Sequence, residues 1–400
     1  MKRIGIVSCY NHPNYGSMLQ AFATQEVIKK IGYEPITYKL DDLMNYSVHS
    51  KILYYIRRLT NISILREKIR RIISARIGRL DKEYQNGIIT RKAAFDKFCQ
   101  EKIELSELNK TRSDLTDLSK TMDAVVVGSD QLWHPRNLEL DLYSLSFVPK
   151  GVKKISYATS IGTNKIPTYT KEEYRKFLMD FHSISVRENT AKNILDELQI
   201  QKKIEVVLDP TLLFSGNDWK DKFNIREDSK NEYIFCYFLG VNPRHREIAN
   251  DISRKTGLKI VTLKNLDEYV LKDKEFGQLY PYDVGPVGFL NLINNAKYVL
   301  TDSFHGSVFS ILFHKQFIVF DRFRKNNKES TNSRIFSLMN IVGLEKYYIT
   351  DDKLNFEKVF NVIDKSIKYE NVEKKIENER KKSINYLVNS FSDVKDAKND

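Results

Sequence analysis

The chain has 400 residues, 41% hydrophobic and 12% aromatic, which is too long for one ordinary hydrophobic core and predicts two domains. Three scattered cysteines without a CxxC pair argue against a disulfide scaffold or a zinc site. No apolar run is long enough for a signal peptide or a membrane span, so we expect a cytoplasmic protein. The net charge of +13 suits nucleic acid, anionic lipid or an acidic substrate, but no zinc finger, RNP signature or Gly-Arg tract supports nucleic acid.

The first predicted unit is a strand, a loop, a helix and a second strand. We expect the strands at Ile4–Ser8 and Glu34–Tyr38 and the helix at Ser17–Lys30. The loop leaves the carboxyl end of a parallel strand, which is where open α/β sheets bind ligands. Asn14–Gly16 can therefore meet a phosphate or a sugar at a helix N-terminus, although an ordinary turn is the favoured interpretation of these residues alone.

Much of the positive charge lies in residues 51–80. Nine basic side chains in this segment face one acid, Glu67, and apolar residues recur at helical spacing. The pattern predicts one or two amphipathic helices with a cationic face. Such helices can lie on an anionic membrane, but a helix packed on its domain with a solvated outer face is the slightly favoured alternative.

Four further strands, each followed by polar residues, are predicted before residue 215. They are expected at Ala124–Val127, Lys154–Tyr157, Ser183–Val186 and Val206–Leu208, with helices at Arg91–Glu104, Lys171–Asp180 and Thr190–Leu198. Parallel strands deliver their exit loops to one edge of a sheet, so we expect these polar groups to lie together. The mostly polar segment Gly216–Asn231 is expected to be a linker.

A second α/β pattern begins at Tyr233. Strands are predicted at Tyr233–Leu239 and Leu258–Thr262 and helices at Arg246–Thr256 and Val287–Asn295. Charged amphipathic helices are expected at Asp352–Tyr369 and Asn371–Phe391, followed by a frayed tail. The expected division is therefore an N-terminal domain at 1–215, a C-terminal domain at 232–365, and a charged helix and tail at 366–400.

One stretch of the second domain combines a strand, a polar turn, a helix and another strand. The strands are Tyr298–Leu300 and Phe317–Phe320, and the turn contains Asp302, Ser303, His305 and Gly306. A histidine beside a helix start can exchange a proton while backbone N–H groups face an anion. An N-cap followed by a packed histidine explains the same residues equally well.

Five segments in order give the chain a resemblance to the polysaccharide pyruvyl transferase family. They are Asn14-Tyr15-Gly16 with Leu19-Gln20-Ala21, Gly128–Trp133 (GSDQLW), Ser185–Glu188 (SVRE), Leu208–Leu213 (LDPTLL) and Thr301–Gly306 (TDSFHG). The resemblance spans roughly three quarters of the chain. It rests on the five segments occurring together in the order typical of the family. It implies an α/β architecture of two Rossmann-like domains facing across a cleft, as in GT-B glycosyltransferases.

The resemblance also implies a reaction. A pyruvyl group would move from phosphoenolpyruvate to two hydroxyls of one sugar, free or on a lipid- or nucleotide-linked glycan, and form a ketal in surface-polysaccharide biosynthesis. Arg187 matches the arginine that the family uses on the donor, and His305 matches its motif histidine. A guanidinium suits a carboxylate or phosphate, and an imidazole can protonate the enol methylene or deprotonate a hydroxyl. We expect no cofactor and no metal, with phosphoenolpyruvate as co-substrate.

The remaining candidates have alternative structural roles. Asp130 and Asp302 can orient His305 or act as base, but capping explains each as well, and Trp133 can stack on a sugar but more readily packs in a core. The expected substrate-binding set also includes Asn14, Tyr15, Gly16, Ser129, Gln131, Ser303, Gly306, Ser307 and Arg244.

The chain departs from the family at one position. Ser303 stands where some members have an arginine two residues before the histidine, which removes one candidate cation for the phosphate. We expect Arg322, Arg324, Arg244 or Lys315 to replace it, or the donor pocket to differ. Two rival functions remain at this stage, namely a glycosyltransferase that uses a nucleotide sugar and a non-catalytic glycan-binding scaffold.

Overall fold

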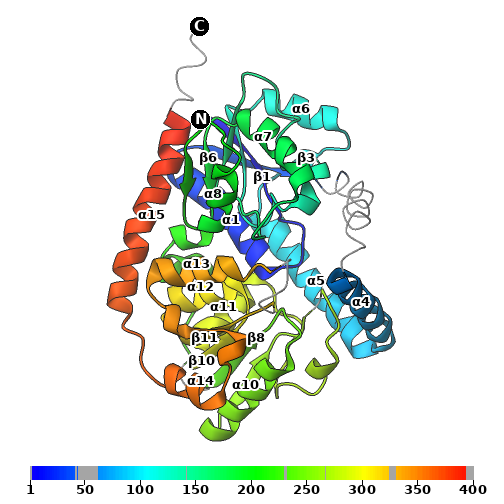
Figure 1. The fold of residues 1–400 in the computed structure, drawn as a ribbon, viewed down its shortest axis with the longest axis vertical. Coiled ribbons are helices and arrows are strands. Elements are labelled where there is room, and N and C mark those ends of the chain that lie inside the picture. The colour runs from blue at the N-terminus through cyan, green and yellow to red at the C-terminus, as the bar shows by residue number, and fades with distance from the viewer. Residues whose placement is uncertain are drawn as a thin grey trace. The chain divides into compact units, whose positions relative to one another are not determined.

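The computed structural model describes residues 2–40, 43, 62–140, 142–228, 232–265, 267–323 and 330–392. The chain forms two compact units (Figure 1). Unit 1 comprises Met1–Arg58, Cys99–Leu213 and Ile376–Asp400, and unit 2 comprises Leu59–Phe98 and Phe214–Lys375. This division differs from the expected one, because residues 62–98 belong with unit 2 and the C-terminal helix belongs with unit 1 from Ile376 onward.

A five-stranded parallel sheet forms the centre of unit 1. Its strand order is β3-β2-β1-β4-β5, and its strands are β1 (Arg3–Val7), β2 (Glu34–Lys39), β3 (Leu105–Leu108), β4 (Ala124–Val127) and β5 (Lys153–Ser156). All four residues of β4 are buried, as expected for a parallel strand covered on both faces. A parallel pair, β6 (Ile184–Val186) and β7 (Ile204–Val206), continues beyond β5 through bridges such as Ile155 to Ser183.

The helices of unit 1 connect these strands. They include α1 (Tyr15–Lys30), α6 (Arg112–Lys120), α7 (Lys171–Met179) and α8 (Asn189–Asp196), with 3-10 turns at η1 (Pro135–Leu140), η2 (Thr168–Thr170) and η3 (Pro210–Leu213). The final helix, α15 (Tyr369–Ser392), joins unit 1 through buried polar contacts. The backbone N–H of Leu208 donates to Ser383 Oγ at 2.9 Å, and the Tyr386 hydroxyl donates to the Ser156 carbonyl at 2.9 Å.

Unit 2 is built around a second parallel sheet, in the order β12-β11-β10-β8-β9. Its strands are β8 (Tyr233–Tyr237), β9 (Lys259–Thr262), β10 (Tyr298–Thr301), β11 (Gln316–Phe320) and β12 (Tyr348–Ile349). Its helices include α4 (Ile62–Leu80), α9 (Gly216–Phe223), α10 (Pro243–Thr256), α11 (Pro286–Asn295), α12 (Phe304–Leu312), α13 (Asn332–Val342) and α14 (Phe356–Ile363), while α5 (Lys82–Lys102) spans the boundary of the two units. Two parallel sheets of this kind confirm the α/β class with two Rossmann-like units.

Two sequence predictions in unit 2 are wrong. The expected linker Gly216–Asn231 begins with α9, which starts in a capping box between Ser215 and Asp218 and buries Trp219 completely against Phe309. The helix expected at Asp352–Tyr369 is shortened to α14, because Asn355 caps a new start. Residues 51–61, 229–231 and 393–400, which carry parts of the expected basic helix, linker and tail, lie outside the described residues.

No helix in the described part of the chain is both long enough and apolar enough to cross a bilayer.

Candidate active site

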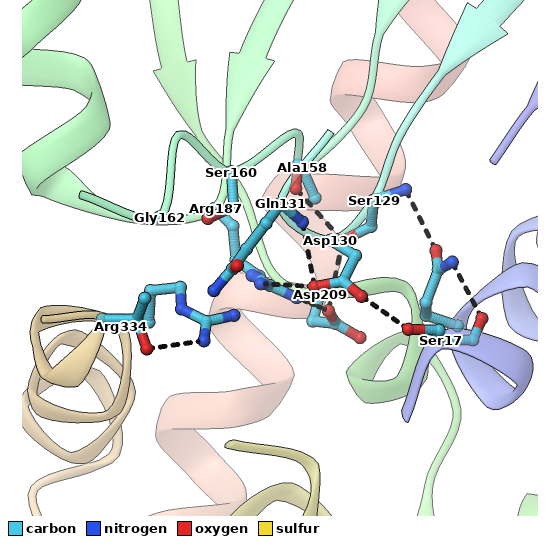
Figure 2. Close-up of polar contacts among 12 residues, drawn as sticks. Ser17, Ser129, Asp130, Gln131, Ala158, Ser160, Gly162, Arg187, Asp209 and Arg334 are labelled. Atoms are coloured by element: carbon cyan, nitrogen blue, oxygen red, sulfur yellow. Dashed lines mark hydrogen bonds and ion pairs between the residues drawn. The ribbon is translucent and has the colours of Figure 1, made fainter. Parts of the chain in front are cut away.

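The exit loop of β4 brings polar groups to the carboxyl edge of the unit 1 sheet. Asp130 has φ +70°, and its Oδ2 accepts a hydrogen bond from Ser17 Oγ at 2.6 Å (Figure 2). Ser17 lies in the first turn of α1, where its backbone N–H is capped by Asn14. A Cβ added at Gly128 would lie 1.9 Å from the Tyr157 carbonyl oxygen, so only glycine fits at the start of this loop.

Arg187 follows β6 and lies among three carboxylates. Its side chain is 2% exposed, Nη1 donates to Asp209 Oδ2 at 2.6 Å, and Nη2 lies 3.6 Å from Asp130 Oδ1 (Figure 2). Nε lies 4.0 Å from Oε2 of Glu188. Desolvation lowers the pKa of the guanidinium, but the three carboxylates outweigh this effect and raise the pKa above its ordinary value. With all four groups ionised, the cluster carries 1 − 3 = −2 charges, so Arg187 by itself does not make this edge attractive to an anion.

Asp209 and Glu188 are held by further hydrogen bonds. Asp209 Oδ1 accepts from the backbone N–H and the hydroxyl of Thr211, at 3.0 and 2.6 Å. Glu188 Oε1 accepts from Ser160 Oγ at 2.8 Å and from the backbone N–H of Ile161 at 3.2 Å. Both side chains are at most 3% exposed, whereas that of Asp130 is 21% exposed. Asp130 is therefore the one carboxylate of this set of three that a substrate can reach.

The other unit 1 candidates fall into two groups, namely buried structural residues and residues at the edge of the sheet. Ser129 is fully buried and joins Gln20 and Asp209 by hydrogen bonds, so its role is structural. Trp133 is also fully buried, with Nε1 donating to the Tyr143 carbonyl at 3.0 Å and the ring edge-on to Phe181. Trp133 therefore packs in the core, the alternative that its size already favoured, and its ring is not exposed for stacking on a sugar. Gln131 is half-buried, and Asn14, Tyr15 and Gly16 form the start of α1.

In unit 2, the loop after β10 is held by its own side chains. Ser303 caps α12 by accepting from the backbone N–H of Gly306, and Ser307 Oγ donates back to the Ser303 carbonyl at 2.8 Å. A Cβ at Gly306 would lie 2.5 Å from Thr301 Oγ1, which is why the loop requires glycine there. Ser303 and Ser307 therefore build the helix start, which is the capping role that the sequence left open.

Asp302 connects the loop after β10 to the loop after β8. Its Oδ1 accepts from the backbone N–H of Leu239 at 2.6 Å and its Oδ2 from that of Gly240 at 2.9 Å, and the residue is 1% exposed. Both carboxylate oxygens are thus engaged by amides at the end of β8. This geometry favours the structural alternative for Asp302 over the role of a base. His305 follows in the first turn of α12, 6% exposed, with its ring edge-on to Phe304 at 5.1 Å between centroids.

His245 was not among the predicted site residues, and it lies fully buried at the same edge of the unit 2 sheet. Its ring stacks on Phe320 at 4.6 Å, and its Nε2 lies 3.2 Å from Asn242 Nδ2. Asn242 Oδ1 caps α10 through the backbone N–H of Arg244, so the amide nitrogen faces the imidazole. Nε2 also lies 3.5 Å from Asp351 Oδ1, and Nδ1 lies 3.9 Å from Asp302 Oδ2. The N-cap motif was readable in the sequence, but the stacking on Phe320 was not.

Three of the four candidate replacement cations lie in the described part of unit 2. Lys315 lies at the far end of α12 and donates to the Asn294 carbonyl, and burial lowers its pKa. Arg244 donates to the Leu354 carbonyl, and the guanidinium of Arg322 lies over the ring of its neighbour Phe323. Arg324 lies outside the described residues.

Arg334 was not among the predicted cations. It lies in the first turn of α13, is 8% exposed and donates from Nη2 to Thr331 Oγ1 at 3.1 Å. Its Cζ is 5.9 Å from the ring centroid of Phe304, the residue before His305. In the part of the chain that the structure describes, no three His, Cys, Asp or Glu side chains are grouped as metal ligands.

The match to known families decides the assignment. The family model described as polysaccharide pyruvyl transferase matches residues 14–322, more than three quarters of the chain. The chain belongs to this family. The polysaccharide pyruvyl transferase match includes the exit loops of both sheets, from Asn14 to the TDSFHG turn. A search of curated proteins found no significant match.

Solved structures similar to this polysaccharide pyruvyl transferase family member include enzymes of nucleotide-sugar metabolism. The UDP-GlcNAc 2-epimerase of Neisseria meningitidis bound to UDP-GlcNAc is 12% identical, with 97% of this chain and 100% of that chain covered and a TM-score of 0.46. The UDP-GlcNAc 2-epimerase of Methanocaldococcus jannaschii, in complex with UDP-GlcNAc and UDP, is 15% identical, with coverages of 94% and 99% and a TM-score of 0.48. MurG of Acinetobacter baumannii is 7% identical, with coverages of 97% and 99% and a TM-score of 0.43. These likenesses assign no ligand to this chain.

Proposed function

We propose that this chain transfers the pyruvyl group of phosphoenolpyruvate to two hydroxyls of one sugar and forms a ketal during surface-polysaccharide assembly. The observation that carries the proposal is membership of the pyruvyl transferase family together with a buried histidine, His305, at the carboxyl edge of a parallel sheet. The acceptor is a sugar, free or on a lipid- or nucleotide-linked glycan.

The reaction requires one proton to be added to carbon and two to be removed from oxygen. Protonation of the enol methylene gives a methyl group and an electrophilic C2, and the first sugar hydroxyl adds to C2 as it loses its proton. The bond from C2 to the phosphate oxygen then breaks, inorganic phosphate leaves, and the second hydroxyl adds to C2 as it loses its proton. One hydroxyl proton balances the proton added to carbon and the other leaves on the phosphate, so phosphoenolpyruvate and a diol give a ketal and inorganic phosphate with no cofactor in the balance.

We assign the carbon protonation to His305. An imidazole can supply a proton near neutral pH, and a positioned acid of this kind contributes about 10²–10⁴-fold to the rate. For the acceptor hydroxyl we assign Asp130, because its carboxylate is the accessible one of the unit 1 set. Asp302 is not assigned as a base, since backbone amides engage both of its oxygens.

The donor carries a phosphate and a carboxylate, so it needs a guanidinium that attracts an anion. We assign this role to Arg334 of α13. It would replace the arginine that some family members have at the position of Ser303. Its contact with the ring of Phe304 supports the assignment, because Phe304 directly precedes His305. A planar guanidinium can contact two oxygens of a phosphate or carboxylate at once. Arg187, surrounded by carboxylates, is assigned to positioning Asp130 and Asp209.

The decisive experiment follows the leaving group. Purified protein is incubated with phosphoenolpyruvate and a panel of glycan acceptors, and in parallel with nucleotide sugars and the same acceptors. The proposal expects release of inorganic phosphate and a product heavier by one pyruvyl ketal. Release of a nucleotide instead would establish a glycosyltransferase. A thermal-shift screen selects the conditions, because a ligand that binds the native state raises Tm.

A further inference from the structure

The helix α4 turns its apolar face to the solvent. Along its described side chains, exposed apolar residues recur at spacings of three and four, namely Ile69 (48% exposed), Ile72 (55%), Ile73 (52%), Ile77 (40%) and Leu80 (84%). Positions three and four apart lie on one side of a helix, so these five side chains form a single stripe, which we call the α4 stripe.

The opposite side of α4 contacts the rest of unit 2. A Cβ added at Gly78 would lie 2.9 Å from the Cβ of Tyr269, so the helix backbone approaches this ring closely. Arg70 Nη1 lies 2.5 Å from Glu268 Oε1, and Arg71 Nε lies 3.9 Å from Glu268 Oε2. The helix thus packs closely at Gly78, while Arg70 and Arg71, whose side chains are 41% and 55% exposed, pair with Glu268. An ordinary surface helix buries its apolar stripe, whereas here the apolar stripe is exposed together with the basic side chains that the sequence predicted to be solvated.

Two arginines accompany the α4 stripe. Arg76 lies three residues after Ile73 and four before Leu80, within the stripe, and Arg79 borders it; both are exposed. The stripe thus combines exposed isoleucines with the guanidinium of an arginine. This combination suits an environment with an apolar layer beside an anionic layer. The lipid headgroup region is such an interface, because the apolar side chains enter the acyl boundary while arginines extend to the phosphates.

We propose that the α4 stripe binds the surface of an anionic lipid bilayer. The proposal goes beyond the transfer reaction and does not depend on it. A second copy of the chain suits the stripe less well, since stacking two stripes would bury Arg76 against like charge without a partner for its desolvated guanidinium. The bilayer instead offers each arginine a phosphate and each isoleucine an apolar environment, and α4 lies in the interface plane without spanning it.

The test uses the full-length protein and sedimented vesicles. Neutral phosphatidylcholine vesicles are compared with vesicles containing about one third phosphatidylglycerol, at about 0.05 and 0.5 M salt. We expect binding to the anionic vesicles at low salt and at least a tenfold weaker partition at high salt, because the Debye length falls as salt rises. Equal binding to neutral and anionic vesicles, or binding to neither, would overturn the proposal.

Matched variants separate the two parts of the stripe. Ile72→Ser with Ile73→Ser should weaken partition about tenfold or more, because two side chains no longer enter the interface. Arg76→Gln with Arg79→Gln should weaken it on the order of 10–30-fold on anionic vesicles only, at roughly fivefold per arginine. The controls are Met179→Ser, which changes an apolar residue of unit 1 that is 65% exposed, and Lys365→Gln with Lys368→Gln, which removes the same charge from an exposed part of unit 2.

Measurements of Tm and of molecular mass distinguish a bilayer from the other possible occupants of the α4 stripe. If water covers the stripe in the free protein, the serine variant keeps the wild-type Tm and molecular mass, since solvent-exposed substitutions change stability little. A large fall in Tm would mean that another part of the chain covers the stripe, and conversion of a dimer to a monomer would mean that a second copy does. Either result would refute a bilayer as the occupant. Transfer to a soluble acceptor should be the same in all these variants, so failure of this proposal leaves the transfer reaction untouched.

Discussion

Arg187 donates from Nη1 to Oδ2 of Asp209 at 2.6 Å, and neither side chain is more than 2% exposed. Removing one partner from a buried ion pair leaves a charge without compensation, which typically costs about 3–5 kcal/mol. We therefore expect Arg187→Gln to lower the free energy of unfolding by about that amount, because three carboxylates would remain around a neutral side chain. Chemical denaturation of the variant measures it.

A lysine at the same position provides the control. Arg187→Lys keeps the charge, so it should recover part of the lost stability while leaving the KM for phosphoenolpyruvate close to that of the wild type. A many-fold increase in that KM in a stable lysine variant would show instead that the guanidinium contacts the donor, as the family resemblance implies, and would remove Arg187 from the positioning role.

The second prediction concerns His305. We expect His305→Ala to lower kcat by about 10²–10⁴-fold, because the methylene carbon loses its proton donor. Phosphate release under saturating phosphoenolpyruvate measures the effect, and Tm verifies the fold. His314→Ala serves as control, since that histidine is half-exposed and pairs with Glu373 on the surface of unit 2. Turnover of His305→Ala at the wild-type rate would end the assignment.

The third prediction tests Arg334 against a cation that the sequence suggested. Arg334→Gln should raise the KM for phosphoenolpyruvate on the order of 10–100-fold, the loss expected for about 1.5–3 kcal/mol of charge-assisted hydrogen bonding. Arg244→Gln should leave this KM unchanged, because Arg244 donates to a backbone carbonyl of its own unit. Equal effects in the two variants would mean that neither guanidinium binds the donor specifically.

The fourth prediction concerns alkaline stability. Burial raises the pKa of Tyr38 to about 12, although a hydrogen bond to Ser119 lowers it. The folded state thus holds this proton more tightly than the unfolded state, whose tyrosine pKa is about 10. The stabilisation is complete below pH 10 and is lost as pH rises through 12, at up to about 1.4 kcal/mol per pH unit.

Tyr38→Phe should remove this dependence. We expect it to cost about 1 kcal/mol at pH 8, for one hydrogen bond, and to lose less stability than the wild type between pH 10 and 11. Urea denaturation at pH 8, 10 and 11 measures the difference. Tyr169→Phe is the matched control, because Tyr169 is 51% exposed. Parallel pH profiles for Tyr38→Phe and the wild type would contradict the prediction.

The strands were the easiest part of the fold to predict. Central strands such as β4 and β10 are continuous apolar runs, because parallel strands are buried on both faces. The short edge strand β3 (LSEL) carries no such run, and neither it nor α6 was predicted. The start of α9 was readable as a serine followed three residues later by an aspartate, but the surrounding charges obscured it.

The site was only partly predictable. Family motifs point to His305 and Arg187, but the three carboxylates around Arg187 come from three separate exit loops, and their convergence depends on the sheet. Arg334 is a single arginine in an ordinary helix turn, with no sequence spacing that links it to Phe304. Periodicity predicted the stripe of α4, but a periodic pattern identifies a face without saying which way that face points.

Unit 1 is assembled from three stretches of the chain, and its last contribution is α15, whose Leu387 and Phe391 are almost fully buried. During synthesis, the first stretch leaves the ribosome long before the helix that completes its core, while most of unit 2 is translated between them. Unit 2 can therefore reach its native state first, because the core of unit 1 is complete only after α15 has been synthesised. Deleting α15 would thus expose the core of the unit that contains β1, although the two segments are far apart in the sequence.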